Sequence, residues 1–310
     1  MAGESRRAVI AALAGNLAIA VTKFIAAALT KSSAMLAEAI HSLVDTGNGG
    51  LLLMGVEKSK EPPDPEHPFG HGRELYFWAL IVGILIFGIG GGMSILEGVL
   101  HILNPHPAED LWWNYATLAI AAIFEGTSWL YGWKAFRAER RNRGIVETIH
   151  VSKDPTSFSV LLEDSAALIG LLFAFSGIFF AHLLDNPALD GIASIVIGLL
   201  LCLVAIVMVY ESKGLLIGEG VDKQTLQKLR ALIEQDPSVE HLNRLLTLYL
   251  GPSDILLTIE LRFRESGSSL DVRRAVERLT KKIQECNPAF RRIFFGAETL
   301  SNPELDPTVQ

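Results

Sequence analysis

Long apolar runs fill the first two-thirds of this chain and limit what it can fold into. An α-helix needs about 20 mostly apolar residues to cross a bilayer. Six segments have that length and character: residues 8–29, 34–56, 76–102, 113–135, 157–183 and 189–211. Beyond about residue 219 the chain is rich in charge, as soluble domains are. We therefore expect a domain of six transmembrane helices (1–214), a soluble domain (215–302) and a tail (303–310).

Composition excludes several classes of protein. Half of the residues are hydrophobic, and a net charge of −7 without any basic patch interleaved with aromatic residues excludes a nucleic-acid partner. Cys202 and Cys286 are too far apart for a CxxC metal site. The N-terminus begins like a signal peptide, but its apolar run continues to Leu29 without a clear cleavage site. We expect this first segment to be kept as a membrane helix.

Lysine and arginine residues indicate the orientation. They precede the first predicted span and follow the second, fourth and sixth: Arg6, Arg7, Lys58, Lys60, Arg73, Lys134, Arg137, Arg140, Arg141, Arg143, Lys153 and Lys213. The loops on the opposite side contain only Lys31. The positive-inside rule then places both termini and the charged domain in the cytoplasm. We expect a multi-pass protein of the cell (inner or plasma) membrane, with the basic segment 134–153 as a loop.

The charged C-terminal region predicts a small α+β domain. A helical pattern begins at Asp222, and two alternating segments, 240–251 and 254–263, predict strands joined by a Gly-Pro-Ser-Asp turn. A second helix follows with Ser269 as its expected N-cap, and residues 291–300 predict a third strand. The order αββαβ is that of a ferredoxin-like or metallochaperone-like domain, for which a dimerisation or regulatory role is the simplest expectation.

Polar residues interrupt the second predicted span in a regular pattern. Glu38, His41, Asp45 and Asn48 follow one another at i, i+3, i+4 and i+7 spacing, so they form one stripe on a helix. A charge at membrane depth costs at least ~2.5 kcal/mol on insertion scales, so such residues usually face a partner or a cavity. His41 and Asp45, one turn apart, can hold one cation together.

The fifth predicted span offers the complementary ligands. It contains Glu163 and Asp164 as neighbours, and Asp164 is the natural partner of His41 and Asp45. An imidazole nitrogen with carboxylate oxygens suits a borderline divalent ion such as Zn²⁺. Adjacent helical residues point about 100° apart, so only one of the pair can face the ion squarely. Glu163 is then a fourth ligand, a residue that contacts and supports the ligands without binding the ion, or a partner of Lys23.

Further polar residues in the spans surround this predicted site. Glu38, Asn48, Glu125 and Asn16 are expected to support the ligands or to carry protons, and Glu97 to lie at the outer interface of the third span. The alternative is a polar network that only holds helices together, although such contacts average about 0.6 kcal/mol in one well-studied case. Glycines in residues 47–50 and 88–94 permit either helix bending or, more simply, close packing.

Three segments together resemble the cation diffusion facilitator family: AEAIHSLVDTGN at 37–48, DPEHPFGHGRELYFWAL at 64–80 and DGIASIVIGLLL at 190–201. The resemblance covers nearly the whole chain. The fragments at 123–130 and 154–170 look most like the branch that contains the animal mitochondrial zinc transporter. This resemblance implies a homodimeric, proton-coupled exporter of Zn²⁺ or a similar ion, without a bound cofactor, and a transporter rather than an enzyme.

The resemblance also implies specific ligands and one departure. His41 and Asp45 match the ligand pair of the second span, and Asp164 matches the second ligand of the fifth. The first ligand there would fall at Val160, which cannot bind a metal. The family's loop pattern for a further metal site is present as Asp64, His67 and His71.

In the C-terminal domain, family members often carry several histidines for a zinc site, and this chain has only His241, with Glu260 at a position where a ligand sometimes lies. We therefore expect a zinc site there to be degraded or absent.

The substrate and the mechanism remain open at this point. Manganese, iron or cobalt are alternatives to zinc, and a cation channel without proton coupling is an alternative to an antiporter. A membrane metalloprotease would need an HExxH motif, which the sequence does not contain. We expect alternating access, in which deprotonated ligands take up the ion from the cytoplasm and protonation, chiefly of His41, releases it outside.

Overall fold

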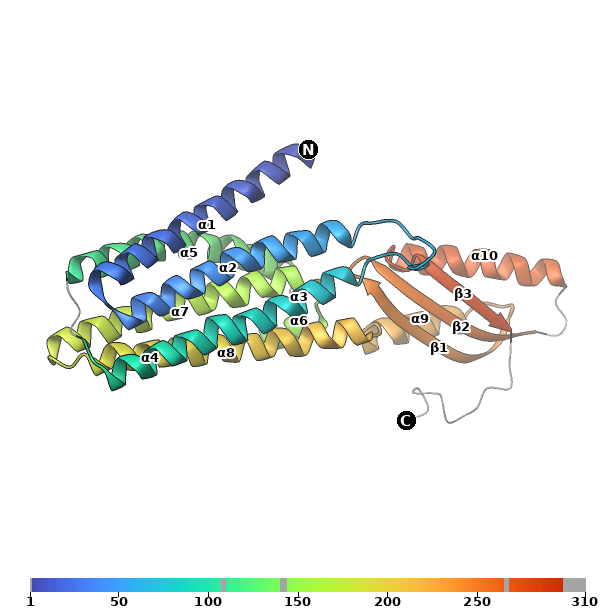
Figure 1. Ribbon diagram of the computed structural model, residues 1–310. Coiled ribbons are helices and arrows are strands. Elements are labelled where there is room, and N and C mark those ends of the chain that lie inside the picture. Colours follow the sequence, from blue (N-terminus) through green and yellow to red (C-terminus); the bar gives the residue numbers. More distant parts are fainter. Residues whose placement is uncertain (1, 107–109, 140–143, 265–267, 298–310) are drawn as a thin grey trace. The chain divides into compact units, whose positions relative to one another are not determined.

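The computed structural model describes residues 2–106, 110–139, 144–264 and 268–297, and they form two compact units (Figure 1). One unit holds the chain up to Lys58 and then Glu74–Lys213. The other holds Ser59–Arg73 and the chain from Gly214 onward. The loop 59–73 thus belongs to the same unit as the C-terminal residues. The predicted division of the chain at residue 214 assigns this loop to the transmembrane domain. The expected tail, 303–310, lies outside the described residues.

The first unit is built of long helices that correspond to the predicted spans. They are α1 (Ala2–Thr30), α2 (Ser33–Lys58), a continuous segment of α3 (Glu74–Leu85), η1 (Ile86–Gly92) and α4 (Met93–Leu103), then α5 (Leu111–Glu139), α7 (Pro155–Leu183) and α8 (Ala188–Ile217). Among the described residues, four stretches are long and apolar enough to cross a membrane: Leu13–Thr30, Glu74–Leu103, Phe158–Leu183 and Ala188–Ile217. The other two long helices, α2 and α5, carry most of the predicted polar site.

Close backbone contacts explain the glycines of the third span. A Cβ atom on Gly91 would lie 2.4 Å from the Sγ of Cys202, and one on Gly98 would lie 2.5 Å from the carbonyl of Gly191. Both contacts join the α3–α4 segment to α8, and any side chain would push the helices apart. The segment contains the π-helix η1 where the glycines are densest. Close packing therefore accounts for Gly91 and Gly98.

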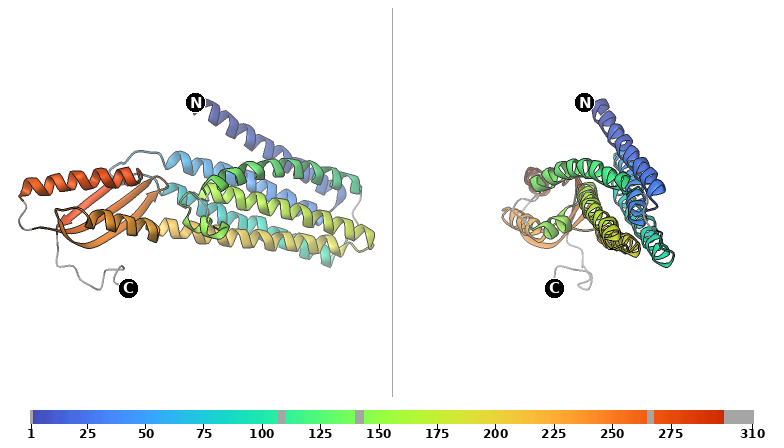
Figure 2. Two further views of the ribbon diagram at one scale, coloured as in Figure 1. Left: turned by 180° about the vertical axis from the view of Figure 1, so that it is seen from behind. Right: turned by 90° about the vertical axis from the view of Figure 1, so that its left-hand side faces the viewer.

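The basic segment 134–153 is largely helical, so the prediction of a loop there is wrong. α5 continues to Glu139, and a short helix, α6, spans Ile145–Val151. α7 then begins cleanly, because Asp154 accepts the backbone N–H of Thr156 and Pro155 occupies the first helical turn. α5 and α7 lie side by side (Figure 2).

The second unit confirms the predicted αββαβ order. Its elements are α9 (Lys223–Glu234), β1 (Val239–Gly251), β2 (Asp254–Phe263), α10 (Ser269–Cys286) and β3 (Arg292–Ala297). β2 is central, antiparallel to β1 and parallel to β3. The buried leucines and isoleucines of α9 and α10 pack with those of the strands in one core. The N-cap of α10 is Ser268 rather than Ser269, because Ser268 and Asp271 bond reciprocally as a capping box.

Candidate metal-transport site

The polar stripe of α2 faces the inside of the helical unit. Glu38, His41 and Asn48 are buried, and Asp45 is half-buried. α2 packs against α1, α3 and α7, so these side chains meet polar groups from neighbouring helices instead of lipid. The stripe therefore has the position that a cation path between helices requires.

Glu163 and Asp164 of α7 are both buried and point to different neighbours. The Glu163 carboxyl interacts electrostatically with Asp45 of α2. The Asp164 Oδ2 instead accepts a hydrogen bond of 2.8 Å from the Ser128 hydroxyl of α5. The angular separation of adjacent helical residues thus divides the pair between α2 and α5. Both carboxyls therefore act on Asp45 of the α2 stripe, and Asp164 is the one that is also hydrogen-bonded to α5.

The predicted ligands are neighbours but do not form a closed coordination shell in this conformation. Among the described residues, the ligand atoms of three or more such side chains come within 4.8 Å of one another only at Asp64, His67 and His71. His41, Asp45, Glu163 and Asp164 therefore need side-chain rotation or a helix shift before they can share one ion.

Lys23 of α1 is fully buried beside this set and pairs with α2. Its Nζ lies 3.0 Å from Glu38 Oε2, 2.7 Å from the Ser42 hydroxyl and 3.8 Å from Glu125 Oε1 of α5. These are the partners that Lys23 has among the described residues, so the alternative in which it pairs with Glu163 is wrong. Glu38 and Glu125 are thereby assigned to an ion-pair network next to the predicted ligands.

Three other residues considered for the membrane site have clear positions. The Asn16 amide of α1 lies 3.5 Å from Asp45 Oδ2, at the limit of a hydrogen bond. Val160, where the resembling family would place a ligand, is 41% exposed on α7. Glu97 is half-buried on α4 and lines a cavity of about 440 Å³ at the end of the bundle that holds the α1–α2 turn. Glu97 therefore lines a cavity at this end of the bundle.

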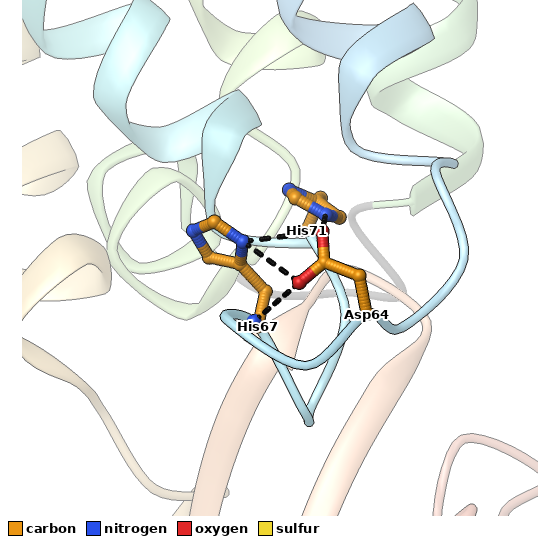
Figure 3. Close-up of side chains that lie close together, drawn as sticks. All are labelled: Asp64, His67 and His71. Atoms are coloured by element: carbon orange, nitrogen blue, oxygen red, sulfur yellow. Dashed lines mark hydrogen bonds and ion pairs between the residues drawn. The ribbon is translucent and has the colours of Figure 1, made fainter.

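The loop 59–73 brings Asp64, His67 and His71 together (Figure 3). Asp64 Oδ1 lies 3.2 Å from His67 Nδ1, and Asp64 Oδ2 lies 3.0 Å from His71 Nε2. The two imidazole rings have their centroids 4.3 Å apart. Two imidazole nitrogens and one carboxylate at these separations are a suitable donor set for Zn²⁺, with a fourth position open to water.

Backbone geometry positions this loop cluster. Asp64 Oδ1 accepts the His67 backbone N–H at 2.5 Å, and the chain turns at Gly70, which has a φ of +78°. Chiefly this backbone hydrogen bond, helped by those from the His71 and His67 rings, holds the pKa of Asp64 below its ordinary value. The carboxylate is therefore ionised and ready to bind a cation at neutral pH.

Arg292 of β3 holds the same loop from the sheet. Its guanidinium donates to the Phe69 carbonyl at 3.1 Å and to Asp254 Oδ2 at 3.3 Å, and its Cζ lies 5.6 Å from the centre of the Phe69 ring. Loop and sheet belong to the same compact unit. No spacing rule in the sequence would have connected Arg292 with a loop more than two hundred residues away.

The two candidate ligands of the C-terminal unit lie on neighbouring strands. His241 is exposed on β1 opposite Arg262 of β2, and Glu260 of β2 lies opposite Arg244. Each faces an arginine across the sheet, which is a poor setting for a cation.

Comparison with known proteins finds one matching family model and several similar proteins. Residues 9–217 match the family model described as the cation efflux transmembrane domain. The chain is 36% identical over 243 residues to the human mitochondrial proton-coupled zinc antiporter SLC30A9, covering 78% of this chain and 43% of that protein. It is 31% identical over 262 residues to metal tolerance protein C4 of Arabidopsis thaliana, covering 84% and 57%.

A bacterial relative extends the range of metals. The manganese efflux system protein MneP of Bacillus subtilis is 26% identical over 245 residues, which is 78% of each chain. The matched region corresponds to about half the length of the human and plant relatives. The names of the human and Bacillus relatives thus give different metals.

Proposed function

Because this chain belongs to the cation efflux family, we propose that it exports divalent transition-metal ions, with Zn²⁺ as the main substrate, in exchange for protons. The match to the transmembrane-domain model covers residues 9–217, which contain every predicted membrane ligand. The names of the human and Bacillus relatives give zinc with proton coupling and manganese, respectively, as what those proteins transport. The activity is transport, so the chain is not an enzyme.

The observation that carries the proposal is the carboxyl and imidazole set between α2 and α7. His41 and Asp45 lie one turn apart on α2, and the Glu163 carboxyl of α7 interacts with Asp45. A rotation of α7 about its own axis would turn Asp164 further toward the α2 stripe and Glu163 away from it, because adjacent helical residues point about 100° apart. We assign His41, Asp45 and Asp164 as the ligands of the transported ion, with Glu163 as a fourth ligand or an acceptor for the released proton.

The nature of the ligands favours zinc over manganese. The nitrogen of His41 suits a borderline ion such as Zn²⁺, whereas hard Mn²⁺ prefers oxygen donors. With Val160 at the position of one family ligand, the remaining proposed ligands are mostly carboxylate oxygens. Transport of Mn²⁺, and also of Fe²⁺ or Co²⁺, is therefore the second candidate function. The identity to the manganese efflux protein favours this second candidate.

Competition between protons and metal for the same lone pairs provides the coupling. The ion binds from the cytoplasm to deprotonated ligands, and a change of the α2–α7 contact opens the site to the other side. Protonation there, chiefly of His41, releases the ion. Glu38, Asn48, Glu125 and Asn16 surround the ligands, and Lys23 keeps Glu38 paired throughout.

We further propose the cellular arrangement that the sequence indicates. The distribution of lysine and arginine supports an arrangement with both termini in the cytoplasm and the protein in the inner or plasma membrane. The αββαβ unit joins two copies into a homodimer. The loop cluster of Asp64, His67 and His71 binds a second Zn²⁺ outside the membrane, and Arg292 links that loop to the sheet.

Transport by purified protein in lipid vesicles tests the function. A zinc-sensitive dye and a pH-sensitive dye are trapped together, and zinc is added outside. Coupled counter-movement of zinc and protons supports the antiporter. Zinc flux that ignores the pH gradient would instead identify a channel or a uniporter. Competition by Mn²⁺, Fe²⁺ and Co²⁺ in the same assay distinguishes zinc from the second candidate function.

A further inference from the structure

Asp190 at the start of α8 caps the start of α2, the helix that carries His41 and Asp45. Its Oδ2 accepts the backbone N–H of Ser33 at 2.5 Å and that of Ala34 at 3.4 Å. Its Oδ1 accepts the Ser32 hydroxyl at 2.8 Å. A buried carboxylate at a helix N-terminus also interacts favourably with the helix dipole. Asp190 therefore fastens the first turn of the proposed transport helix to α8.

Side-chain oxygens cap the first turn of α2. The first N–H groups of a helix have no partner within that helix. Here Asp190 accepts those of Ser33 and Ala34, and the Ser32 hydroxyl accepts that of Met35 at 3.1 Å, while the Leu36 N–H makes the first regular helical bond, to the Ser32 carbonyl. Any movement of the Asp190 carboxylate thus leaves two buried amides of α2 without a partner.

His101 of α4 lies beside this cap with a free ring nitrogen. Its side chain is buried, with 8% of the residue exposed, and its Nε2 has no hydrogen-bond partner among the described residues. The same Nε2 lies 3.8 Å from Asp190 Oδ2. A neutral imidazole gains nothing at that distance, whereas a protonated one would form an ion pair with the carboxylate.

A cavity gives His101 access to the medium. The cavity of about 440 Å³ that Glu97 lines is also lined by His101 and by the α1–α2 turn. The charged and titratable groups that face His101 or the same cavity are Asp190 from α8, Lys31 from the α1–α2 turn, Glu97 from α4 itself and His106 from the α4–α5 connection. The His106 ring is turned aside by a hydrogen bond from its Nδ1 to the Asn104 carbonyl.

We propose that His101 is a proton-accepting switch for α2: a proton taken from the cavity draws Asp190 away from the first turn of that helix. The imidazolium donates to Oδ2 at the usual charge-assisted distance of about 2.8 Å. The Ser33 and Ala34 amides share that oxygen, so they lose part of their cap. α2 becomes freer to move when the pH in this cavity falls.

The role of this switch in ion release rests on the proposed function. If α2 and α7 rearrange to release the ion at this end of the bundle, a switch here lets outside acidity promote release. Histidine is the side chain whose charge changes between pH 5 and 8, which suits such a role. Asp190 is a positioning residue in this scheme and does not touch the transported ion.

Hydrogen exchange measured by mass spectrometry on the full-length protein tests the switch without depending on transport. The readout is the protection of the Ser33 and Ala34 amides, corrected for the intrinsic pH dependence of exchange. In the wild type, protection should fall about fivefold between pH 7.5 and 5.5, the size expected for losing one helix cap. His101→Gln, always neutral, should stay protected, and His101→Arg, always charged, should be unprotected at both pH values.

A matched control and a transport measurement complete the test. His182→Gln changes an exposed histidine at the end of α7 and should leave the pH response unchanged. The proposal is overturned if amide protection in the wild type does not depend on pH, or if the pH response persists in His101→Gln. If a variant does not fold, the wild-type pH series is sufficient to test the proposal. In zinc-uptake vesicles, His101→Gln should reduce the acceleration caused by an acidic lumen. Absence of any zinc transport by the wild type would count against the proposed function and leave the exchange result standing.

Discussion

Lys23 of α1 and Glu38 of α2 form a fully buried ion pair, with 3.0 Å between Nζ and Oε2. The pair joins two helices next to the proposed transport ligands. We expect Lys23→Met to destabilise the protein by about 3–5 kcal/mol, because it leaves the Glu38 carboxylate buried without its cation. The double variant Lys23→Met/Glu38→Leu should recover most of this loss. Unfolding followed by denaturant titration in detergent measures both, and a neutral Lys23→Met would contradict the assigned pairing.

The hydrogen bond from Ser128 to Asp164 should affect metal affinity. Ser128 holds one oxygen of the carboxylate, and the loss of such a supporting contact typically lowers metal affinity 10–100-fold. We expect Ser128→Ala to weaken zinc binding about tenfold, and Asp164→Asn to weaken it more. Thr127→Ala, one residue away, is the matched control, because the Thr127 hydroxyl bonds only the Phe124 carbonyl of its own helix among the described residues. Equal zinc affinities for the Ser128 and Thr127 variants would argue against the contact.

Glu163 and Asp164 should differ in how they contribute. Both carboxyls interact electrostatically with Asp45 in this conformation, but Asp164 is also held by the Ser128 hydroxyl of α5. If Glu163 accepts the released proton, Glu163→Gln should retain zinc binding within about threefold and transport fewer protons per zinc ion. Simultaneous zinc and pH recordings give that ratio. A loss of zinc binding in Glu163→Gln as large as in Asp164→Asn would make Glu163 a direct ligand.

The loop cluster should bind zinc separately from the membrane site. Replacing both His67 and His71 by Ala should remove one equivalent of bound zinc per chain and leave vesicle transport present. Because protons and zinc compete for the same imidazole nitrogens, affinity at this site should fall as the pH is lowered. The lowered pKa of Asp64 keeps its carboxylate available to the ion. Zinc titrations from pH 5.5 to 7.5 measure this.

The C-terminal unit should lose stability in acid through Asp236. Arg278 donates to both of its oxygens at 3.0 and 2.8 Å, and chiefly for this reason the pKa of Asp236 is lowered. A carboxyl with a lowered folded-state pKa stabilises the fold above its unfolded value of about 3.9, and the gain disappears as the pH falls through the folded value. Asp236→Asn should therefore lower stability at pH 7 and narrow its difference from wild type below pH 4, as thermal unfolding can show.

The sequence was sufficient to predict the elements because their signals are local. Apolar length predicts the spans, and alternation with a turn at 251–254 predicts the β1–β2 hairpin. The loop cluster was also predictable, since Asp64, His67 and His71 lie within eight residues. The extent of α5 was not, because the positive charges after its apolar part are compatible with either a loop or an exposed helix end.

Long-range pairings could not be predicted in the same way. Lys23 forms ion pairs with Glu38 and Glu125 on other helices, and only packing selects these partners over Glu163. Ser128 carries no signal of its own in the sequence. Asp190 belongs to a segment that resembles the family, yet its role as the cap of α2 depends on a contact between residues 157 positions apart. Such contacts follow from how the helices pack rather than from spacing along one of them.

Anomalous X-ray scattering at the zinc edge from zinc-loaded crystals tests most directly the proposal that one ion binds between α2 and α7. We expect a peak bounded by His41, Asp45 and Asp164, abolished in Asp45→Asn, and a separate peak at Asp64, His67 and His71. A zinc-loaded protein with the loop peak alone, and with His41, Asp45 and Asp164 still directed to separate surroundings, would contradict it.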